Sequence, residues 1–154
     1  MIVRVDQIII EKASQQDLAE ILTLLDSLNL PTEGVAENLV GFVTARSRDG
    51  RLVGTIGLER HGRIGLLRSA AVAHDLQRSG LGSRLTVRLL EEAGKAGIEE
   101  VLLLTSTARE FFERRFGFEE ADRDQYTSDL SNSVEWNLPR CSSAVLLRHA
   151  VENQ

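Results

Sequence analysis

Cysteine is almost absent from this 154-residue chain, and its scarcity excludes several kinds of site. The single cysteine, Cys141, cannot form an internal disulfide or supply a zinc site built from several thiolates. The three histidines (His61, His74 and His149) are scattered along the sequence, so we expect no metal centre. Nothing near Cys141 would depress its pKa, and we interpret it as a packed residue rather than a reactive thiol.

Long hydrophobic runs and an excess of positive charge are also lacking. The longest apolar runs, such as residues 101–104, are far shorter than the roughly 20 residues that cross a bilayer. The sequence has no basic-then-apolar leader with a small-residue cleavage site, so we expect a cytoplasmic protein without a membrane partner. The 18 Lys and Arg residues against 23 Asp and Glu give a net charge of −5, which disfavours binding to nucleic acid.

The remaining composition is typical of one soluble globular domain. Hydrophobic residues make up 42% of the chain and charged residues 27%. The length suits one domain with a substantial core, and no repeat, low-complexity segment or linker divides it. We therefore expect a single domain over residues 1–154.

Strand-like and helix-like stretches alternate, which predicts a mixed α/β (α+β) fold. β-branched residues predict a first strand over residues 7–12. Ser14, followed by Asp17 in an acidic first turn, is typical of a helix start, and apolar residues at spacings of three and four continue to Leu28. We expect a loop over residues 29–38.

Three strands are predicted next, over residues 39–46, 51–60 and 64–73. The dipeptides Asp49-Gly50 and His61-Gly62 separate them and favour tight turns. The three strands should therefore form an antiparallel meander.

The second half of the chain continues the alternation. We predict a helix over residues 79–94, a buried strand over residues 101–105 and a helix over residues 108–115. Thr107 and Glu110 suggest a capping box for the last of these helices. The remaining predicted features are a helix end at Gly117, a return toward the sheet over residues 118–121, a short helix over residues 130–136 and a final strand over residues 144–147.

A glycine-containing segment joins the meander to the helix that follows it. Residues 77–82 read Gln-Arg-Ser-Gly-Leu-Gly. Backbone amides at the positive end of a helix dipole bind anions, and the missing Cβ atoms of Gly80 and Gly82 let a phosphate approach closely. A P-loop is excluded because no lysine follows Gly82, and a dinucleotide fingerprint is excluded because Leu85 stands where its third glycine would lie.

This segment fits the pattern Gln/Arg-x-x-Gly-x-Gly/Ala, and it resembles the acetyl-CoA loop of the GCN5-related N-acetyltransferases (GNAT). The order of the elements and the Phe-Gly-Phe at residues 116–118 are similar to that family too, over nearly the whole chain. The resemblance implies a mixed, mostly antiparallel sheet flanked by helices, with the fourth and fifth strands splayed apart.

Shorter segments resemble a narrower group, the small N-acetyltransferases often encoded near arsenic-resistance genes. They include Gly-Leu-Glu at residues 57–59, Leu-Leu-Thr-Ser-Thr-Ala at residues 103–108 and Cys-Ser-Ser-Ala-Val at residues 141–145. Leu-Leu-Thr-Ser-Thr is also similar to the acetyltransferase domain of N-acetylglutamate synthase. Both resemblances imply a small, amino-acid-like amine as acceptor.

The family resemblance implies acetyl-CoA as co-substrate and assigns residues to it. The pyrophosphate would lie on the amides of residues 77–82, the pantetheine arm would bond to strand backbone at residues 70–72, and the Val72 amide would bind the oxyanion. The implied set is Ala70, Ala71, Val72, Gln77, Arg78, Ser79, Gly80, Leu81, Gly82 and Ser83. Arg84 and Arg88 share a helix face and either meet phosphates or are solvated.

Candidates for catalysis and acceptor binding follow from the predicted strands. Glu59 is a candidate base, since burial would raise its pKa toward neutrality, but it is equally an exposed charge or an arginine's partner. Arg68 interrupts an apolar run and either binds a substrate carboxylate or forms an ion pair with Glu59. Thr105 and Ser106 are further acceptor contacts. His61 and His74 have suitable intrinsic pKa values but lie in turns.

One departure from the family concerns the general acid. Many members carry a tyrosine on the helix before the Gly-Phe turn, whereas residues 111–116 offer no hydroxyl group and Tyr126 lies outside this helix. We therefore expect the CoA thiolate to take its proton from water. We also expect direct attack of the amine on the thioester, because no Cys or Ser lies in a triad-like setting to serve as nucleophile. A noncatalytic acyl-CoA-binding module and a protein N-acetyltransferase stay open as alternatives, and apolar residues of the last strand suggest a homodimer.

Overall fold

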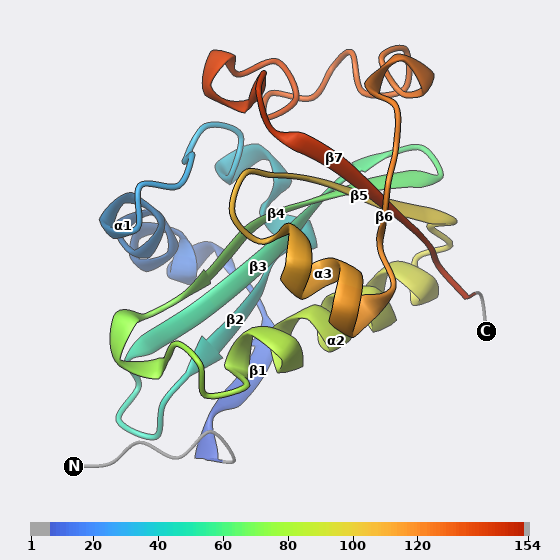
Figure 1. Cartoon of the computed structure of the whole chain (residues 1–154). Coiled ribbons are helices and arrows are strands. Elements are labelled where there is room, and N and C mark those ends of the chain that lie inside the picture. The colour runs from blue at the N-terminus through green and yellow to red at the C-terminus, as the bar shows by residue number, and fades with distance from the viewer. Residues whose placement is uncertain (1–6, 153–154) are drawn as a thin grey trace. The chain divides into compact units, whose positions relative to one another are not determined.

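The computed structural model describes residues 7–152 and contains a seven-stranded mixed sheet (Figure 1). The strand order is β1-β2-β3-β4-β5-β7-β6, in which β4 and β5 are parallel and the β1/β2, β2/β3, β5/β7 and β6/β7 pairs are antiparallel. This confirms the expected mixed α/β fold. The strands are β1 (Ile9–Lys12), β2 (Val43–Arg46), β3 (Leu52–His61), β4 (Ile64–Val72), β5 (Glu100–Thr105), β6 (Glu119–Glu120) and β7 (Val145–Ala150).

The chain divides into two compact units. The first runs up to Leu58 and includes Ser69–Leu89, and the second consists of Glu59–Arg68 and the residues from Leu90 onward. The α-helices within the described residues are α1 (Leu18–Ser27), α2 (Leu81–Lys95) and α3 (Arg109–Phe116).

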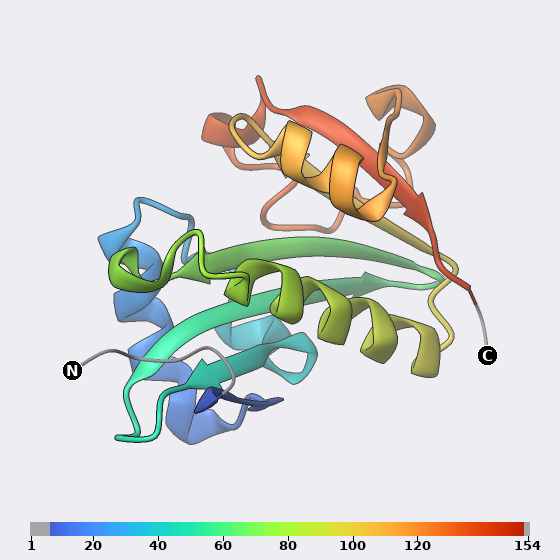
Figure 2. The ribbon, with the colours of Figure 1, turned by 60° about the horizontal axis from the view of Figure 1, so that its bottom comes forward.

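The first unit is built around α1 and the adjoining strands. The Asp17 carboxylate accepts a hydrogen bond from the Ser14 amide at 2.8 Å, which confirms the predicted helix start. Ile21 and Leu25 of α1 are fully buried. They pack with Phe42, Leu52 and other apolar residues of this unit, while the first half of α2 crosses the other side of β2 and β3 (Figure 2).

The prediction was wrong about the segment before β2. Ala36–Gly41 form a 3-10 helix, so neither a loop to residue 38 nor a strand from residue 39 is present. The Phe42 amide donates to the Leu39 carbonyl oxygen at 3.0 Å, and this turn buries Leu39 without an extended backbone. Apolar periodicity alone does not distinguish these two ways of burying Leu39 and Phe42.

In the second unit, β5 is the buried central strand. It pairs with β4 from Ile64–Glu100 to Leu67–Leu103 and with β7 along its whole length (Figure 1). Val101 and Leu102 are fully buried, as a strand covered on both faces requires. The expected splay of the two strands beyond Leu67 and Leu103 stays a prediction.

Aromatic packing attaches α3 to this part of the sheet. The Phe112 ring of α3 packs edge-on against Phe118, which stacks on His149 of β7 with 5.0 Å between ring centroids. Gly117 ends α3 with a φ of 71°, which confirms the predicted helix end.

Two local predictions for this unit were wrong. Thr107 and Glu110 form no capping box, because the Thr105 hydroxyl oxygen accepts the amide hydrogens of Thr107 and Ala108 at 3.3 and 2.8 Å instead. Residues 130–136 form turns rather than a helix, between 3-10 helices at Arg123–Gln125 and Pro139–Cys141. Within this segment Ser133 hydrogen-bonds to the distant Glu59, a contact that sequence spacing does not reveal.

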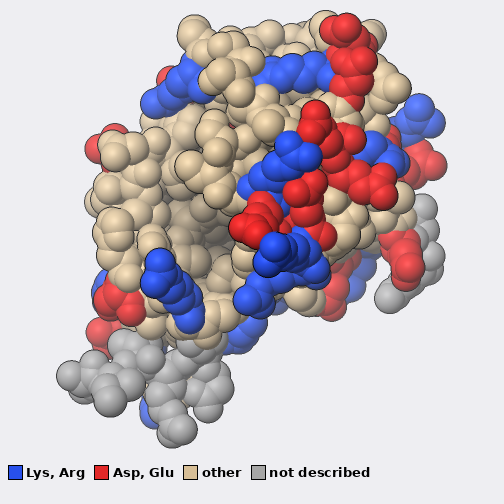
Figure 3. Space-filling model, viewed as in Figure 1, with Lys and Arg blue, Asp and Glu red and all other residues tan. Residues whose placement is uncertain are grey.

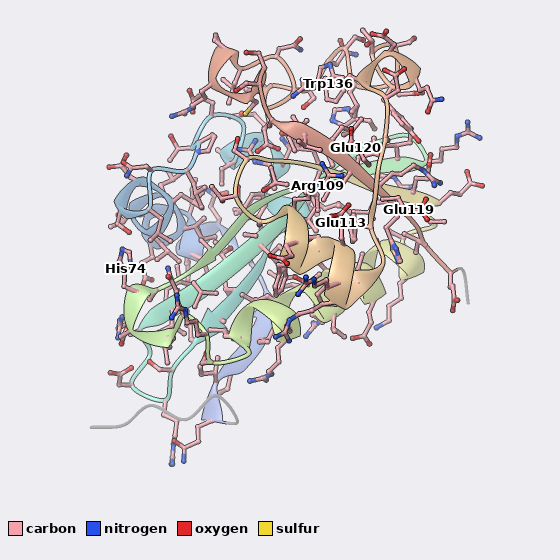
Figure 4. The ribbon with its side chains drawn as sticks, in the orientation of Figure 1. His74, Arg109, Glu113, Glu119, Glu120 and Trp136 are labelled. Carbon is pink, nitrogen blue, oxygen red and sulfur yellow. The ribbon has the colours of Figure 1, made fainter. Side chains whose placement is uncertain are left out.

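Charges of both signs alternate on the surface of α3 and β6 (Figure 3). Arg109 bonds to Glu113 and Glu120, and Arg114 pairs with Glu110. In Figure 4, Arg109 and Glu113 extend from α3 near Glu119 and Glu120. None of the helices within residues 7–152 is long and apolar enough to span a membrane.

We predict that Gly57→Ala destabilises the protein by about 1–3 kcal/mol. An added Cβ would lie 2.4 Å from the Phe42 ring, which is far closer than van der Waals contact. Urea denaturation measures the loss, and Val87→Ala on the exposed side of α2 is the control with an effect within about 0.5 kcal/mol. Phe42→Leu should partly rescue Gly57→Ala, and strictly additive effects of the two changes would contradict this explanation.

Candidate functional site

The loop between β4 and α2 has a backbone that sequence periodicity alone would not predict. His74–Leu76 form a 3-10 helix whose Leu76 side chain is buried. Arg78 and Gly80 then adopt left-handed conformations, with φ values of 65° and 93°. The Gln77 side-chain amide donates to the Val72 carbonyl oxygen at 3.0 Å, which ties the loop back to the end of β4.

This loop leads directly into the first turn of α2. The helix begins at Leu81, so its first amides have no acceptor within the helix, and the Leu81 amide donates to the Ser79 hydroxyl oxygen at 3.4 Å. Nothing lies within 4 Å of the position where a Cβ of Gly80 would be. The N-terminus of α2, open space at Gly80 and a helix dipole together suit an anion such as a phosphate.

Arg84 and Arg88 have a structural role that sequence analysis missed. The Arg84 guanidinium donates to the Ile8 carbonyl oxygen at 3.2 Å, and that of Arg88 donates to the Ile10 carbonyl oxygen at 3.1 Å. These bonds join α2 to the backbone of the β1 region. The solvated helix face considered for these arginines is therefore wrong, because both side chains are half-buried against this backbone.

The end of β4 is the segment assigned to the pantetheine arm, and its residues differ in their exposure to solvent. Ser69 has a φ of 59°, a left-handed conformation that is unusual inside a strand and marks a local irregularity. Ala70 is exposed, Ala71 is buried and Val72 is half-buried. The strand irregularity therefore directly precedes the three residues assigned by resemblance.

A buried ion pair lies in the second unit. The Arg68 guanidinium contacts the Glu59 carboxylate at 2.7 Å, with side-chain exposures of 0% and 1%. The Ser133 hydroxyl and the His61 imidazole also hydrogen-bond to Glu59 Oε1. Ser133 in turn accepts the amide hydrogen of Trp136 at 3.1 Å, so the cluster fixes part of the C-terminal segment. Of the two interpretations of Arg68, the ion pair with Glu59 is confirmed.

The expected rise in the pKa of Glu59 is wrong. Burial acts to raise this pKa, but hydrogen bonds from Ser133, His61 and Arg68 and the charge of Arg68 together hold it below its ordinary value. Glu59 is therefore a stable carboxylate that neutralises Arg68. The assignment of Glu59 as general base loses its physical basis.

A second buried carboxyl, Glu135, was missed by sequence analysis. Within residues 7–152, its Oε2 is the buried side-chain polar atom that has no hydrogen-bond partner. Burial raises the pKa of Glu135 to about 7; the Arg68 charge opposes this rise and the Glu59 charge adds to it. The only sequence signal was an acidic residue between Val134 and Trp136, in a segment without clear periodicity.

The other candidate residues lie in varied surroundings. The Thr105 hydroxyl oxygen accepts two amide hydrogens just before α3, as described, and Ser106 beside it is exposed. His74 is exposed and lines a groove of about 570 Å³ together with α1 residues of the same unit (Figure 4). Cys141 is buried with a pKa raised by burial, which agrees with a packed cysteine.

Tyr126 has a structural role in the second unit. Its hydroxyl donates to Glu100 Oε1 at 2.8 Å, and Arg148 bonds to the same oxygen at 2.7 Å. Burial and the Glu100 hydrogen bond raise the pKa of Tyr126. This phenol is therefore engaged within its own unit and is a poor source of a proton.

Comparisons with known proteins give a matching family model and solved structures with a similar fold. Residues 10–118 match the model of the acetyltransferase (GNAT) family. Rv2747 from Mycobacterium tuberculosis, solved with CoA and NLQ, is 20% identical over 94% of this chain and 99% of that chain, with a TM-score of 0.76. Ard1 from Thermoplasma volcanium is 19% identical over 96% and 99% of the two chains, with a TM-score of 0.73.

A longer protein with a similar fold is N-acetylglutamate synthase from Neisseria gonorrhoeae, solved with coenzyme A and N-acetyl-glutamate. It is 22% identical over 95% of this chain but only 35% of that chain, with a TM-score of 0.75. A search of curated proteins gave no match. At these identities the solved structures establish the fold.

We predict that Glu135 makes folding stability depend on pH. Its folded pKa of about 7 exceeds the ordinary value of 4.5, so its contribution is fully present below pH 4.5 and is lost as pH rises through about 7. Relative to Glu135→Gln, the wild type should therefore lose about 3 kcal/mol of unfolding free energy between pH 4.5 and pH 8.

Urea denaturation of the two proteins at both pH values measures this difference. Glu100→Gln, which removes a hydrogen-bonded carboxyl of the same unit but keeps Glu135, is the matched control and should keep the loss of stability expected of the wild type. A constant difference between wild type and Glu135→Gln at both pH values would contradict the assigned environment of Glu135.

Proposed function

This chain belongs to the GNAT family of acetyltransferases, and we propose that it transfers the acetyl group of acetyl-CoA to the primary amine of a small, amino-acid-like substrate. The observation that carries this proposal is the loop of residues 77–82, which opens α2 with the backbone geometry of an anion site. We further propose that residues 1–154 act as one domain of this kind.

Acetyl-CoA binding is proposed to use backbone more than side chains. The pyrophosphate would lie on the amides of residues 77–82, and Ser83 would also belong to the binding site. The pantetheine arm would bond to strand backbone at Ala70, Ala71 and Val72. The open space beside Gly80 supports a close approach of phosphate to the chain. Structures similar to this chain include proteins solved with CoA.

The proposed reaction is direct attack of the neutral amine on the thioester carbonyl. The Val72 amide would stabilise the oxyanion of the tetrahedral intermediate, and the CoA thiolate would then leave. A covalent acetyl-enzyme on cysteine is disfavoured because Cys141 is buried and its pKa is raised. Since Tyr126 is engaged with Glu100, we propose that the thiolate takes its proton from the amine or from water.

An amino-acid-like acceptor is favoured by charge and by resemblance. Arg68 is a buried guanidinium suited to a carboxylate, and we propose that it contributes to acceptor binding together with Thr105 and Ser106. The segments similar to the arsenic-resistance-associated acetyltransferases support the same class, which includes phosphorus and arsenic analogues of amino acids. N-acetylglutamate synthase, with a similar fold, was solved with N-acetyl-glutamate.

An acetylation screen tests the proposed function. Purified protein is incubated with acetyl-CoA and a panel of amino acids, their phosphorus and arsenic analogues, simple amines and peptides, and release of the CoA thiol is measured. We expect thiol release that depends on a free amino acid or close analogue. Release only with peptides would favour a protein N-acetyltransferase, and acetyl-CoA binding without release for any acceptor would favour a noncatalytic module.

We predict that Arg68→Lys raises the acceptor KM about tenfold or more while changing the acetyl-CoA KM less than twofold. Lysine keeps a positive charge opposite Glu59 but loses the planar fork that binds a carboxylate through two hydrogen bonds. Steady-state kinetics with each substrate varied in turn measure both constants. Arg109→Lys, the same change on the exposed surface of α3, is the control. Equal increases in the two KM values would refute the acceptor role of Arg68.

A further inference from the structure

Glu135 lies in a charged cluster whose polar groups are otherwise paired. Glu59 accepts hydrogen bonds from Arg68, Ser133 and His61. Glu135 is 7% exposed, and its charge interacts with Arg68 and Glu59, yet its Oε2 accepts no hydrogen bond. The cluster therefore contains one guanidinium and two carboxyl groups, of which one has an unsatisfied oxygen.

This oxygen requires an explanation because burial without a hydrogen bond is costly for a polar atom. A buried carboxylate is costlier still, unless a cation accompanies it. Arg68 is already balanced by Glu59, so one positive charge is lacking when Glu135 is ionised. A ligand that brings an N–H donor and a positive charge would supply both missing interactions.

We propose that Glu135 binds the ammonium group of the acceptor and removes its proton, and is thus the general base of the acetyl transfer. The proposal rests on the proposed function, because it concerns the acceptor of that reaction.

In the proposed reaction the acceptor enters as an ammonium ion and transfers one proton to Glu135. One N–H bond breaks and an O–H bond forms on Glu135, which leaves an electron pair on nitrogen. That pair attacks the thioester carbonyl, the N–C bond forms and the C–S bond breaks. A second proton passes from nitrogen to the CoA sulfur, and Glu135 later returns its proton to water. A carboxyl that titrates near neutrality suits this exchange.

Several charged or titratable groups surround Glu135 and enter the interpretation of any pH dependence. Arg68 of β4 and Glu59 of β3 act on it directly, and Cys141 interacts with its charge from the following 3-10 helix. His61 reaches the cluster through Glu59. Since histidine side chains also titrate near neutral pH, His61→Gln must be compared with changes at Glu135.

The test compares pH profiles of kcat/KM for wild type, Glu135→Gln, Glu135→Asp and His61→Gln with the best acceptor of the screen. We expect Glu135→Gln to lower kcat at least about 100-fold at pH 7. It should also abolish the rise of kcat/KM with pH that the wild type shows near neutrality. Glu135→Asp should restore part of the rate, with the rise of kcat/KM at a different pH. His61→Gln should keep the wild-type rise of kcat/KM with pH. Acetyl-CoA affinity, measured by calorimetry, should change less than twofold in each variant.

An acceptor that needs no deprotonation separates a base from a structural residue. An aminooxy analogue of the best acceptor has a neutral nitrogen at pH 7, so Glu135→Gln should acetylate it within about threefold of the wild-type rate. Glu100→Gln, which removes a hydrogen-bonded carboxyl elsewhere in this unit, should leave the acetylation rates of both acceptors unchanged.

Three results would overturn the proposal. They are a Glu135→Gln enzyme within threefold of wild type for the ammonium acceptor, an equal loss with the aminooxy analogue, and an unfolded Glu135→Gln protein, because Oε2 has no native bond to lose. Failure of the wild type to acetylate any amine would overturn the proposed function itself, and this inference with it.

Discussion

The buried ion pair between Glu59 and Arg68 is the interaction on which the second unit depends. A guanidinium with no exposed surface is tolerated only beside an ionised partner, because removing either member would leave an unpaired charge and cost about 3–5 kcal/mol. Ser133 joins the C-terminal segment to the same carboxylate. The turns after β6 thus obtain their order from a polar cluster as well as from apolar packing of Leu130 and Trp136.

A second constraint is conformational and acts on the loop before α2. The left-handed residues Arg78 and Gly80 turn the chain sharply between a strand and a helix. Glycine adopts this conformation at no steric cost, whereas at Arg78 a side chain must be held in it by the surrounding hydrogen bonds. The turn leads into the first amides of α2, and backbone amides at a helix N-terminus suit an anion even in a chain with a net charge of −5.

Local sequence signals predicted most of the fold because they report interactions within a few residues. The Ser14–Asp17 helix start, the α1 periodicity, the turn glycines and the end of α3 at Gly117 are of this kind. The errors arose where distant residues decide the structure. Leu39 is buried from a 3-10 turn, and Thr105 rather than Thr107 accepts the amide hydrogens just before α3. Residues 130–136 form turns in which Ser133 bonds to Glu59, rather than a helix.

The residues of the candidate site also differ in whether a local sequence signal predicts them. The loop proposed to bind acetyl-CoA could be proposed from the sequence because its signal is a contiguous motif, whereas the sequence did not distinguish the two carboxyls. Glu59 and Glu135 are chemically identical, yet their environments move their pKa values in opposite directions. Glu59 receives three hydrogen bonds and is committed to neutralising Arg68, so it has no capacity to exchange a proton near neutral pH. Glu135 shares the burial without those bonds, and only the three-dimensional arrangement identifies it as the carboxyl able to gain and lose a proton.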